Sequence, residues 1–526
     1  MLMGQMESII RKLAARPRCS ILILGLVLLM VGNWILPITD RDEARFSEAS
    51  REMIQRGDYI VPWFNGAWRL YKPALIYWCQ IGSYRVLGIN DFSARVPTVL
   101  FTVATALLLV QWGRKIADAK TGFLAGAMFL TCLHVAIIGR IATADMAMVF
   151  FFTLAAWSGW EATRPQQSAH WKWWAIFYVA LGLGFLAKGP EAWLPLGAMI
   201  LGRVMRKDSF RLPLMETAAG IVLAAAIVAA WGIPALVRTH GAFWSVGMNE
   251  QVYQRAVAVN NSHGFAGLRG YLLALPFYFL TFLVSFLPWT IRKPADLESW
   301  FQNQRQKGAA WRFLVPILWI LSFLLHIPIK IWRWWQNRER DDLGWYLLMV
   351  AAIVFIVFSL VKTKLPHYTM PAFPCLALWL ALQLRSDATS FAWFQTRFAA
   401  MVILIPTIML GLAIAAKNYT LTERLWAAVQ PNVLPGAKVG CFGYVEPSLV
   451  WKFRSVVTNN VVLGDENVAK NFLTNRPPFI LVLPTRDVAS LPDTNGLWVV
   501  VHGLDMVRFK NRDLTAIMRF APGTRD

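Results

Sequence analysis

The chain has 526 residues, of which 57% are hydrophobic and only 16% are charged. A soluble domain is roughly 45–50% apolar and about 25% charged. The apolar residues here fall in many separate blocks of about 16–22 residues, and one such block crosses the hydrocarbon layer as a helix. The composition therefore excludes an ordinary soluble protein and predicts a mainly α-helical protein that crosses the membrane many times.

The formal net charge of +22 needs its own explanation. In a soluble protein it would suggest nucleic acid, but Lys and Arg also collect in the cytoplasmic loops of membrane proteins. Part of the excess can face anionic lipid headgroups, so we expect membrane lipids, and no nucleic acid, as partners. The five cysteines contain no CxxC pair, which argues against a disulfide scaffold and a zinc site.

The first apolar block runs from Ser20 to Pro37, with basic residues before it and no small-residue cleavage site after it. This pattern is typical of a retained first span whose N-terminus is inside. The stretch 39–91 that follows is too charged to cross the membrane. Two parts of it, Asp42–Arg56 and Pro73–Leu87, have helical patterns, and we expect them to lie on the outer membrane surface.

Ten further spans are predicted, and the basic loops between them place the polar loops outside. These spans are Arg95–Trp112, Thr121–Ile138, Ala144–Glu161, Trp173–Ala187, Glu191–Leu201, Pro213–Ile233, Tyr271–Trp289, Trp345–Leu360, Pro371–Leu384 and Trp393–Ala416. Basic runs flank Trp311–Ile331 on both sides, so we interpret it as an interfacial or re-entrant hairpin. Residues 1–416 then form a membrane domain of eleven crossings, after which the chain is outside.

Residues 417–526 have a different character. Short apolar runs rich in β-branched residues are separated by pieces such as Glu466–Leu473 and Asp487–Leu491. The runs are A-K-V-G-C-F-G-Y, R-S-V-V-T-N-N-V-V-L, F-I-L-V-L-P and L-W-V-V-V-H-G. The pattern predicts a small α/β domain on the outer side of the membrane.

Charged residues gather at four predicted outer loops, and at membrane depth such residues usually face a cavity. The first cluster, Asp40–Arg45, could bind a cation, a hydroxyl or a sugar, but its carboxylates also suit a helix start. In the second cluster, Lys72 precedes a helix that opens with Pro73. Its ammonium suits a phosphate, or it extends to the interface as a snorkelling lysine.

The third cluster ends in Asp145, in the first turn of a predicted span. A carboxylate there either interacts with the helix dipole or faces a cavity. The fourth cluster combines Ala187–Pro190 with Lys362–Tyr368. Basic residues on the outer side break the positive-inside pattern. An anionic ligand would explain this exception, and so would an error in the predicted topology.

These motifs follow one another in a fixed order: D-R-D-E-A-R-F, Y-K-P-A-L-I-Y-W, A-R-V-P, A-T-A-D, L-A-K-G-P and K-L-P-H-Y-x-x-P. The ordered set resembles the bacterial branch of the protein O-mannosyltransferase superfamily, in particular the lipid A aminoarabinose transferases. The resemblance covers the membrane part and the small C-terminal domain. It implies the GT-C fold, a polyprenyl-phosphate sugar donor, and transfer on the periplasmic side with inversion at the anomeric centre.

By motif, the resemblance implies that Asp42 and Asp145 are the catalytic acids and that Lys72 lies near the carrier phosphate. The other substrate-binding positions are Glu43, Arg45, Tyr71, Lys188, Glu250, Arg255, His263, Lys364, His367 and Tyr368. No cofactor is assigned, although Asp42 and Glu43 could hold a divalent cation. Some relatives carry a histidine after the glutamate of the large outer loop, where this chain has Gln251, which leaves the sugar and the acceptor open.

The expected function is an inverting glycosyltransferase of the bacterial inner membrane. It would move a sugar from undecaprenyl phosphate to lipid A or another lipopolysaccharide-type glycolipid on the periplasmic face. Transfer to protein Ser/Thr or to an O-antigen intermediate stays an alternative. So does a non-enzymatic transporter of lipid-linked saccharide, although the sequence lacks the two matching halves typical of transporters. It also lacks the GxGxxG and GxxxxGK[ST] motifs of nucleotide binding.

Overall fold

The computed structural model describes residues 2–38, 41–164, 170–205, 212–254, 267–291, 326–336, 341–385, 388–434, 436–457, 460–506 and 508–520. Two of the predicted substrate-binding residues, Arg255 and His263, therefore lie outside the described residues, as does most of the predicted hairpin 311–331.

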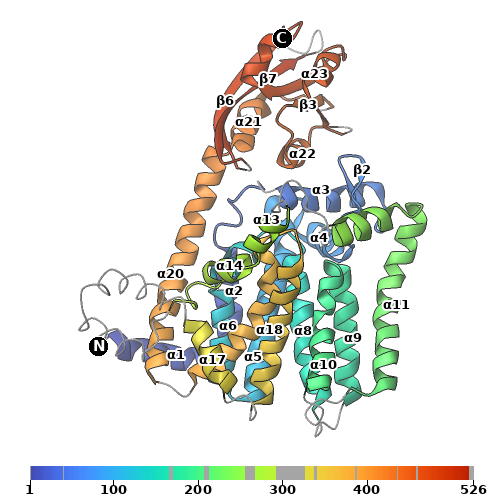
Figure 1. The fold of residues 1–526 in the computed structure, drawn as a ribbon. Helices are drawn as coiled ribbons and strands as arrows, with labels where there is room; N and C mark the ends of the chain where they lie inside the picture. Colours follow the sequence, from blue (N-terminus) through green and yellow to red (C-terminus); the bar gives the residue numbers. More distant parts are fainter. Residues whose placement is uncertain are drawn as a thin grey trace.

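Upright helices form a bundle, drawn vertically in Figure 1. They are α2 (Pro17–Met30), α5 (Asp91–Ile116), α6 (Ala119–Leu130), α8 (Asp145–Thr163), α9 (His170–Ala187), α10 (Leu194–Met205), α11 (Leu214–Arg238), α18 (Asp342–Leu360), α19 (Phe373–Leu384) and α20 (Ala388–Tyr419). Shorter helices join them: α1 (Leu2–Ala15), α7 (Leu133–Ile138), α13 (Gly267–Ala274), α14 (Phe277–Ser285) and α17 (His326–Gln336).

Four helices in the described part of the chain are long and apolar enough to cross a membrane: α5, α11, α18 and the Phe391–Tyr419 part of α20. The bent pair of α1 and α2 is a fifth candidate. The chain is therefore a polytopic membrane protein. The predicted span Thr121–Ile138 is broken into α6 and α7, and several bundle helices are shorter than a full crossing, so the count of eleven crossings stays a prediction.

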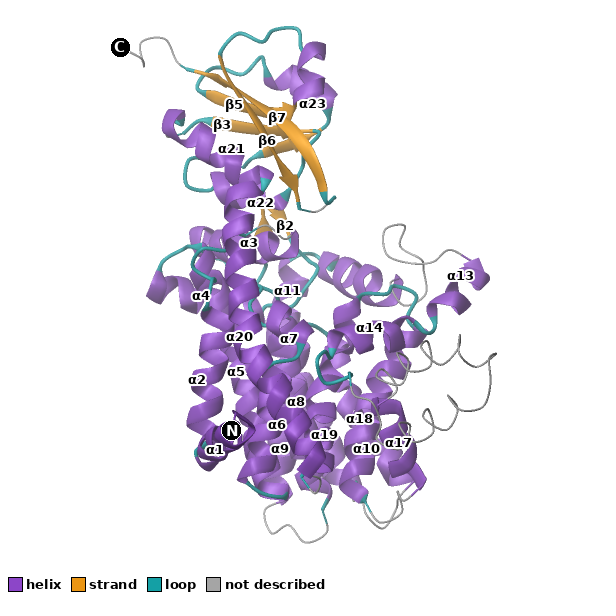
Figure 2. Ribbon diagram, turned by 90° about the vertical axis from the view of Figure 1, so that its left-hand side faces the viewer, coloured by secondary structure: helices purple, strands orange, loops and turns teal. Residues whose placement is uncertain are grey.

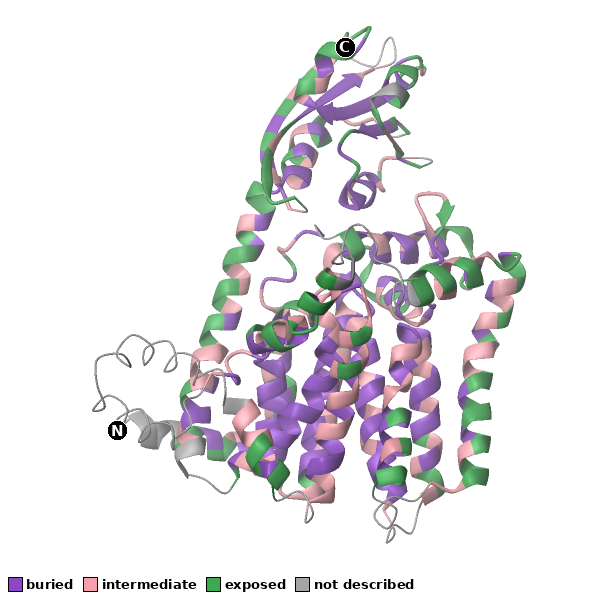
Figure 3. Cartoon of the chain, in the orientation of Figure 1, coloured by how far each residue is buried: buried purple, intermediate pink, exposed green. Residues whose placement is uncertain are grey.

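Small residues bring the central helices into close contact. A Cβ atom on Gly113 of α5 would lie 2.6 Å from the Cα atom of Gly122 on α6. Such contacts let two helix backbones approach where no hydrophobic effect drives their association. Figure 3 shows the buried interior of the bundle, whereas α11 and α20 stand at its edge with much of their surface exposed. Their exposed apolar side chains suit contact with lipid.

A second layer lies across one end of the bundle (Figure 1). It contains α3 (Arg41–Arg56), α4 (Leu75–Leu87) and a hairpin of β1 (Trp63–Phe64) and β2 (Ala67–Trp68). The two helices predicted for the stretch 39–91 are confirmed. Phe46 and Met53 on the apolar face of α3 pack against Ile76 and Tyr77 of α4, which is the packing that an amphipathic helix requires.

A buried ion pair joins this outer layer to the bundle. The carboxylate of Glu43 on α3 accepts hydrogen bonds from Nε and Nη2 of Arg95 on α5, at 2.6 and 2.8 Å. The side chains of Glu43 and Arg95 are only 3% and 1% exposed. Arg95 also donates to the carbonyls of Leu36 and Pro37, and Glu43 accepts from the backbone N–H of Ala142 at 2.9 Å. Four segments of the chain thus meet at one point.

The C-terminal domain lies beyond the outer layer, at the same end of the molecule (Figure 2). Its five-stranded sheet has the order β4-β3-β5-β7-β6. The strands are β3 (Lys438–Phe442), β4 (Val462–Gly464), β5 (Phe479–Pro484), β6 (Leu497–Asp505) and β7 (Lys510–Arg519). Parallel pairing of β3 with β4 and β5 gives way to antiparallel pairing of β7 with β5 and β6. Strand β7 was not predicted from the sequence.

Helices complete the domain: α21 (Leu421–Val429), α22 (Pro447–Phe453) and α23 (Glu466–Phe472). One core packs α21 and α22 against the sheet through Leu421, Leu425 and Leu449. A second core, around Phe442 and Phe472, places α23 on the sheet as well. Both cores are separate from that of the bundle, as the α/β composition of this part predicts.

We predict that Arg95→Met destabilises the whole outer end of the protein, because it leaves the Glu43 carboxylate buried without its partner. Breaking a buried pair in this way typically costs about 3–5 kcal/mol. Thermal unfolding in detergent should show a clearly lower midpoint. The control is Arg11→Met, which removes an exposed pair with Glu7 and should leave the midpoint unchanged. Equal midpoints for the two variants would contradict the prediction.

Candidate active site

Three segments that are far apart in the sequence converge where the outer layer meets the bundle. Asp145 is the first residue of α8, and Lys188 follows directly on α9. His367 and Tyr368 belong to η4 (Pro366–Ala372), a 3-10 helix between α18 and α19. Helix α8 contacts both η4 and η1 (Pro190–Trp193), so the predicted residues of the third and fourth sequence clusters lie together.

Asp145 and Lys188 form a close ion pair. The Nζ atom of Lys188 donates to Oδ1 of Asp145 at 2.8 Å, while the hydroxyl of Thr143 donates to Oδ2 at 2.8 Å. The side chains are only 7% and 13% exposed for Lys188 and Asp145. His367 approaches the same carboxylate, with Nε2 3.9 Å from Oδ1. Both oxygens of Asp145 are thus engaged, and the carboxylate fixes the position of the lysine ammonium.

The glycine after Lys188 permits the sharp backbone turn between α9 and η1. Gly189 has a φ of +130°, a region that residues with a Cβ atom rarely adopt. The turn ends α9 and lets Pro190 begin η1 at once. Glu191 in that short helix then lies 3.7 Å from Lys188. The L-A-K-G-P motif is therefore a turn that presents one lysine to two acids.

A cavity of about 160 Å³ opens beside this pair. Three of the predicted residues line it: Tyr71, Lys72 and Lys188. Glu191 is also in its wall, and aromatic side chains from Phe185, Trp231, Phe243 and Trp244 provide much of the rest. The cavity thus combines two lysines with an aromatic lining, an arrangement that suits an anion attached to an apolar or sugar-like group.

Asp42 belongs to the same neighbourhood. Its side chain is 63% exposed and pairs with Arg45 at 3.3 Å. Burial lowers the pKa of His367 to about 4, an effect opposed by the carboxylates of Asp145 and Asp42 and reinforced by the Lys188 ammonium. The charge of Asp42 also acts on the buried hydroxyl of Tyr77, and the Tyr77 oxygen accepts from Nε of Arg69 at 3.2 Å. Glu43, the next residue along α3, accepts a hydrogen bond from the backbone N–H of Ala142 at 2.9 Å, three residues before Asp145, and this contact brings Asp42 near the Asp145 cluster.

Lys364 lies beside the cluster but is held differently. Its ammonium donates to the carbonyls of Phe358 and Ser359, at 3.0 and 2.5 Å, and so caps the end of α18. Burial lowers its pKa to about 8. The neighbouring Tyr368 ring packs on Phe358 and faces Lys188, whose Nζ atom is 5.2 Å from the ring centroid. Tyr368 thus contacts the ion pair through Lys188, whereas the ammonium of Lys364 is held by the end of α18.

Two predicted substrate-binding residues are placed less favourably. Glu43 is fully enclosed by Arg95 and Ala142, so the structure gives it a packing role that differs from the expected contact with substrate. No group of three or more His, Cys, Asp or Glu side chains that could hold a metal ion occurs among the described residues, and the divalent cation considered at Asp42 and Glu43 stays a prediction. Glu250 is exposed on the π-helix η2 (Trp244–Gln254), next to the cavity-lining residues Gly247 and Met248.

Several residues of the site were missed in the sequence. His134 on α7 hydrogen-bonds Ser285 at 2.8 Å and influences His367 electrostatically. Arg69 stacks near Tyr71 and binds Tyr77, and Thr143 and Glu191 complete the pair around Lys188. An ionisable residue inside an apolar block is a recognised sign of a functional position, and this sign would have identified His134.

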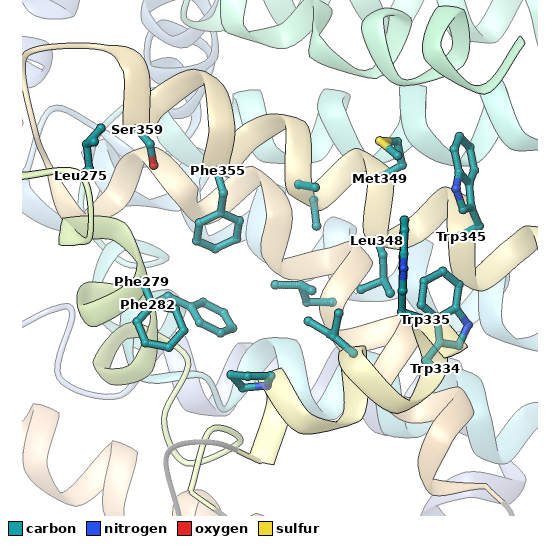
Figure 4. A pocket seen from close by; sticks show the side chains of 15 residues that line it. Leu275, Phe279, Phe282, Trp334, Trp335, Trp345, Leu348, Met349, Phe355 and Ser359 are labelled. Atoms are coloured by element: carbon teal, nitrogen blue, oxygen red, sulfur yellow. The ribbon is translucent and has the colours of Figure 1, made fainter. Parts of the chain in front are cut away.

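A larger cavity of about 400 Å³ lies elsewhere, between α14, α17 and α18. Figure 4 shows its lining of aromatic and aliphatic side chains, with Phe279 and Phe355 toward one end and Trp345 toward the other. None of the predicted site residues lines it. Its chemistry suits a hydrocarbon chain, whereas the charged groups that could act on a sugar or phosphate surround the smaller cavity.

Comparison with known proteins finds relatives in the family that the ordered motifs resemble. Residues 71–231 match the family model described as dolichyl-phosphate-mannose-protein mannosyltransferase. The chain is 28% identical over 465 residues to the undecaprenyl phosphate-alpha-4-amino-4-deoxy-L-arabinose arabinosyl transferase of Enterobacter sp. (strain 638), covering 84% of this chain and 74% of the relative. An uncharacterized protein of Aquifex aeolicus is 25% identical, over 73% of this chain and 76% of its own length.

The fold matches the crystal structure of ArnT from Cupriavidus metallidurans bound to undecaprenyl phosphate, with a TM-score of 0.72. The match covers 94% of this chain and 97% of that one, at 16% identity. The chain therefore has the GT-C membrane fold. The predicted GT-C fold, with outer-surface helices and a small C-terminal α/β domain, is thereby confirmed, and so is the resemblance that the ordered motifs indicated.

The half-buried imidazole of His367, 28% exposed, makes a pH prediction for this protein. A folded-state pKa of about 4, against about 6.5 in the unfolded chain, means that the unfolded state binds the proton more readily. The stability contributed by neutral His367 is full above pH 6.5 and is lost as the pH falls toward 4. Thermal midpoints measured between pH 7.5 and pH 5 should therefore fall less in His367→Gln than in the wild type. An equal fall in His367→Gln and in the wild type would contradict the assignment.

Proposed function

We propose that this protein transfers a sugar from a polyprenyl-phosphate carrier to lipid A or a related lipopolysaccharide-type glycolipid, with inversion at the anomeric carbon. The observation that carries the proposal is the double role of Lys188. It lines the cavity together with Tyr71 and Lys72, and it is fixed by Asp145 at 2.8 Å. The name of the Enterobacter relative supports an undecaprenyl-phosphate-linked pentose as the donor.

The donor phosphate lies between Lys72 and Lys188 in this proposal. Two ammonium groups in a confined cavity neutralise a phosphodiester and then stabilise the charge that develops on the leaving phosphate. A cavity of about 160 Å³ matches a phosphate with part of a single sugar ring rather than an oligosaccharide. Tyr71, Trp231 and Trp244 provide the aromatic surfaces on which a sugar face packs.

The chemical step requires one displacement. The acceptor oxygen attacks the anomeric carbon from the face opposite the phosphate, the new C–O bond forms, and the bond to the phosphate oxygen breaks. Its electron pair leaves with the polyprenyl phosphate. If the acceptor is a hydroxyl, the exposed carboxylate of Asp42 takes its proton as general base. If it is an ionised phosphate, no proton moves and Asp42 orients the acceptor.

The role of Asp145 differs from that of Asp42. Its two oxygens are engaged by Lys188 and Thr143, so we assign it the positioning of Lys188 rather than proton transfer. His367 and Tyr368 border the cluster and Arg45 pairs with Asp42; these three would contact the sugar or the acceptor, with Lys364 at the edge of the cluster. Glu250, Arg255 and His263 belong to the large outer loop and would contact the acceptor, a part of the proposal that rests on the motif resemblance alone.

The orientation follows from the same proposal. The site, the outer layer and the C-terminal domain lie at one end of the bundle (Figure 2), which we place on the periplasmic face of the bacterial inner membrane. This end is the one that the basic loops of the sequence assign to the outside. We retain the division into a membrane domain, 1–416, and a periplasmic domain, 417–526, with α20 continuing to Tyr419 as the connection.

Protein Ser/Thr or an O-antigen intermediate is the alternative acceptor. Incubation with donor carrying a labelled sugar distinguishes them: label in lipid A supports the proposal, whereas label in protein with unlabelled lipid A reverses the choice of acceptor. A transporter of lipid-linked saccharide would move the intact donor across vesicles and leave no labelled product.

We predict that Asp42→Asn and Lys72→Met lose turnover with undecaprenyl phosphate-4-amino-4-deoxy-L-arabinose and lipid A. Removing a general base typically costs about 10²–10⁴-fold, and a smaller loss is expected if Asp42 only orients an ionised acceptor. Removing one cationic group from the leaving phosphate should cost about 10²–10³-fold. Mass spectrometry of the lipid product measures both. The control Asp513→Asn changes an exposed carboxylate of the C-terminal sheet, and near-normal turnover in both test variants would remove the assignment.

We also predict that Lys188→Met weakens the binding of undecaprenyl phosphate, because the cavity loses one of its two ammonium groups. The dissociation constant, measured by thermophoresis in detergent, should rise about tenfold or more, and the loss should shrink at high salt. Lys120→Met is the matched control, since Lys120 lies over the ring of Phe391, away from the cavity lining. Unchanged affinity in Lys188→Met would contradict the placement of the phosphate.

A further inference from the structure

A second ion pair holds the start of α3, one residue before Asp42. The guanidinium of Arg41 donates from Nε to Oε2 of Glu446 at 3.0 Å and from Nη2 to Oε1 at 2.8 Å. Glu446 belongs to the C-terminal domain and immediately precedes α22. Its side chain is 6% exposed, whereas that of Arg41 is 44% exposed. The bond is bidentate, and this geometry restricts orientation as well as distance.

The same helical turn is held from its other side by Glu43. That carboxylate is anchored in the bundle by Arg95 and by the backbone N–H of Ala142. Asp42 thus lies between a residue fixed to the C-terminal domain and a residue fixed to the membrane bundle. The first turn of a helix has free N–H groups and frays readily, so the two side contacts together determine where the Asp42 carboxylate points.

The C-terminal domain has other anchors on the outer layer. Trp451 of α22 is buried among Ala44, Tyr84 and Ala142, and its Nε1 atom donates to Asp91 at 2.7 Å. On the β1–β2 hairpin, the Asn65 side chain donates to the carbonyl of Val461 at 2.8 Å and accepts from its N–H at 2.9 Å. These contacts keep the domain docked when the pair of Arg41 and Glu446 is lost.

We propose that Glu446 acts through Arg41 as a positioning residue for Asp42, so that the docked C-terminal domain sets the geometry of the acceptor side of the active site. This inference rests on the proposed function, because it presumes that Asp42 acts on the acceptor. Neither Arg41 nor Glu446 lines the cavity that holds the donor phosphate. Their effect is therefore expected in the chemical step and not in donor affinity.

The test compares Glu446→Gln and Arg41→Gln with the wild type, using undecaprenyl phosphate-4-amino-4-deoxy-L-arabinose and lipid A. We expect kcat to fall about tenfold in both variants, since small misplacements of a reacting group are costly, with the KM for the donor unchanged. Arg41→Lys, which restores one charged contact, should recover part of the loss. Normal kcat in Glu446→Gln, or a raised donor KM as its main effect, overturns the inference.

A second measurement places the effect on Asp42. In the Asp42→Asn background, Glu446→Gln should lower the residual turnover, followed over long incubations, by less than about twofold, because residues that act as a unit are non-additive. A further tenfold loss in the double variant would mean that Glu446 acts independently of Asp42 and would overturn the inference.

The matched control removes a different anchor of the same domain. Asn65→Gly deletes both hydrogen bonds to Val461 while tolerating the φ of +52° at this position. Its kcat should stay within about twofold of the wild type. If it loses as much as Glu446→Gln, general loosening of the domain explains the effect and the specific pair does not. Thermal midpoints of all variants identify any that fail to fold, and Arg41→Gln, which changes the more exposed partner, then carries the test.

The outcome also distinguishes this inference from the function beneath it. Near-normal turnover of Asp42→Asn overturns the proposed function and this inference together. Loss of turnover in Asp42→Asn with normal turnover in both Glu446→Gln and Arg41→Gln overturns the inference alone.

Discussion

The ion pair between Glu43 and Arg95 is the contact on which the outer end of the protein depends. Two charges taken out of water are tolerated only when each finds a full set of partners, and here the partners come from α3, α5, the chain after α2 and the loop before α8. The pair therefore fixes the relative position of Asp42, one residue before Glu43, and Asp145, which follows that loop. A site assembled from distant segments needs such a shared anchor.

The charged side chains of the candidate site differ from the pair of Glu43 and Arg95 in their access to a cavity. The Glu43 carboxylate and the Arg95 guanidinium are enclosed and make many hydrogen bonds, whereas Lys188 and Lys72 reach a cavity. Asp145 holds Lys188 on one side and leaves the other side toward the lining. Cations at the membrane boundary are costly, and in the proposed function the phosphate of the lipid-linked donor would bind between these two ammonium groups. The apolar cavity between α14 and α18 provides hydrocarbon surface within the same bundle.

The bundle, the outer layer and the C-terminal domain differ in the surroundings that their surfaces suit. The bundle interior is packed through small residues and aromatic rings, and its outer helices expose apolar side chains as lipid requires (Figure 3). The outer layer carries the polar loops, and the C-terminal domain, with its own cores, contacts that layer through Glu446 and Trp451. The candidate site thus lies where the polar outer layer meets the apolar bundle.

The sequence by itself determined that the chain lies in a membrane and which family it resembles. Long apolar blocks require a bilayer whatever their arrangement, and motif order survives low overall identity. Local patterns also predicted α3, α4 and the strands β3, β5 and β6, because amphipathic and β-rich runs depend on near neighbours. Strand β7 was missed since its K-N-R-D start lacks an apolar alternation. Only the tertiary structure showed which charged residues pair with each other. Asp145 and Lys188 are 43 residues apart in sequence, and Glu43, although it follows Asp42 directly, pairs with Arg95. Contacts between distant segments leave no periodic signal in the chain, so the convergence of the site could be expected from the motifs but located only in three dimensions.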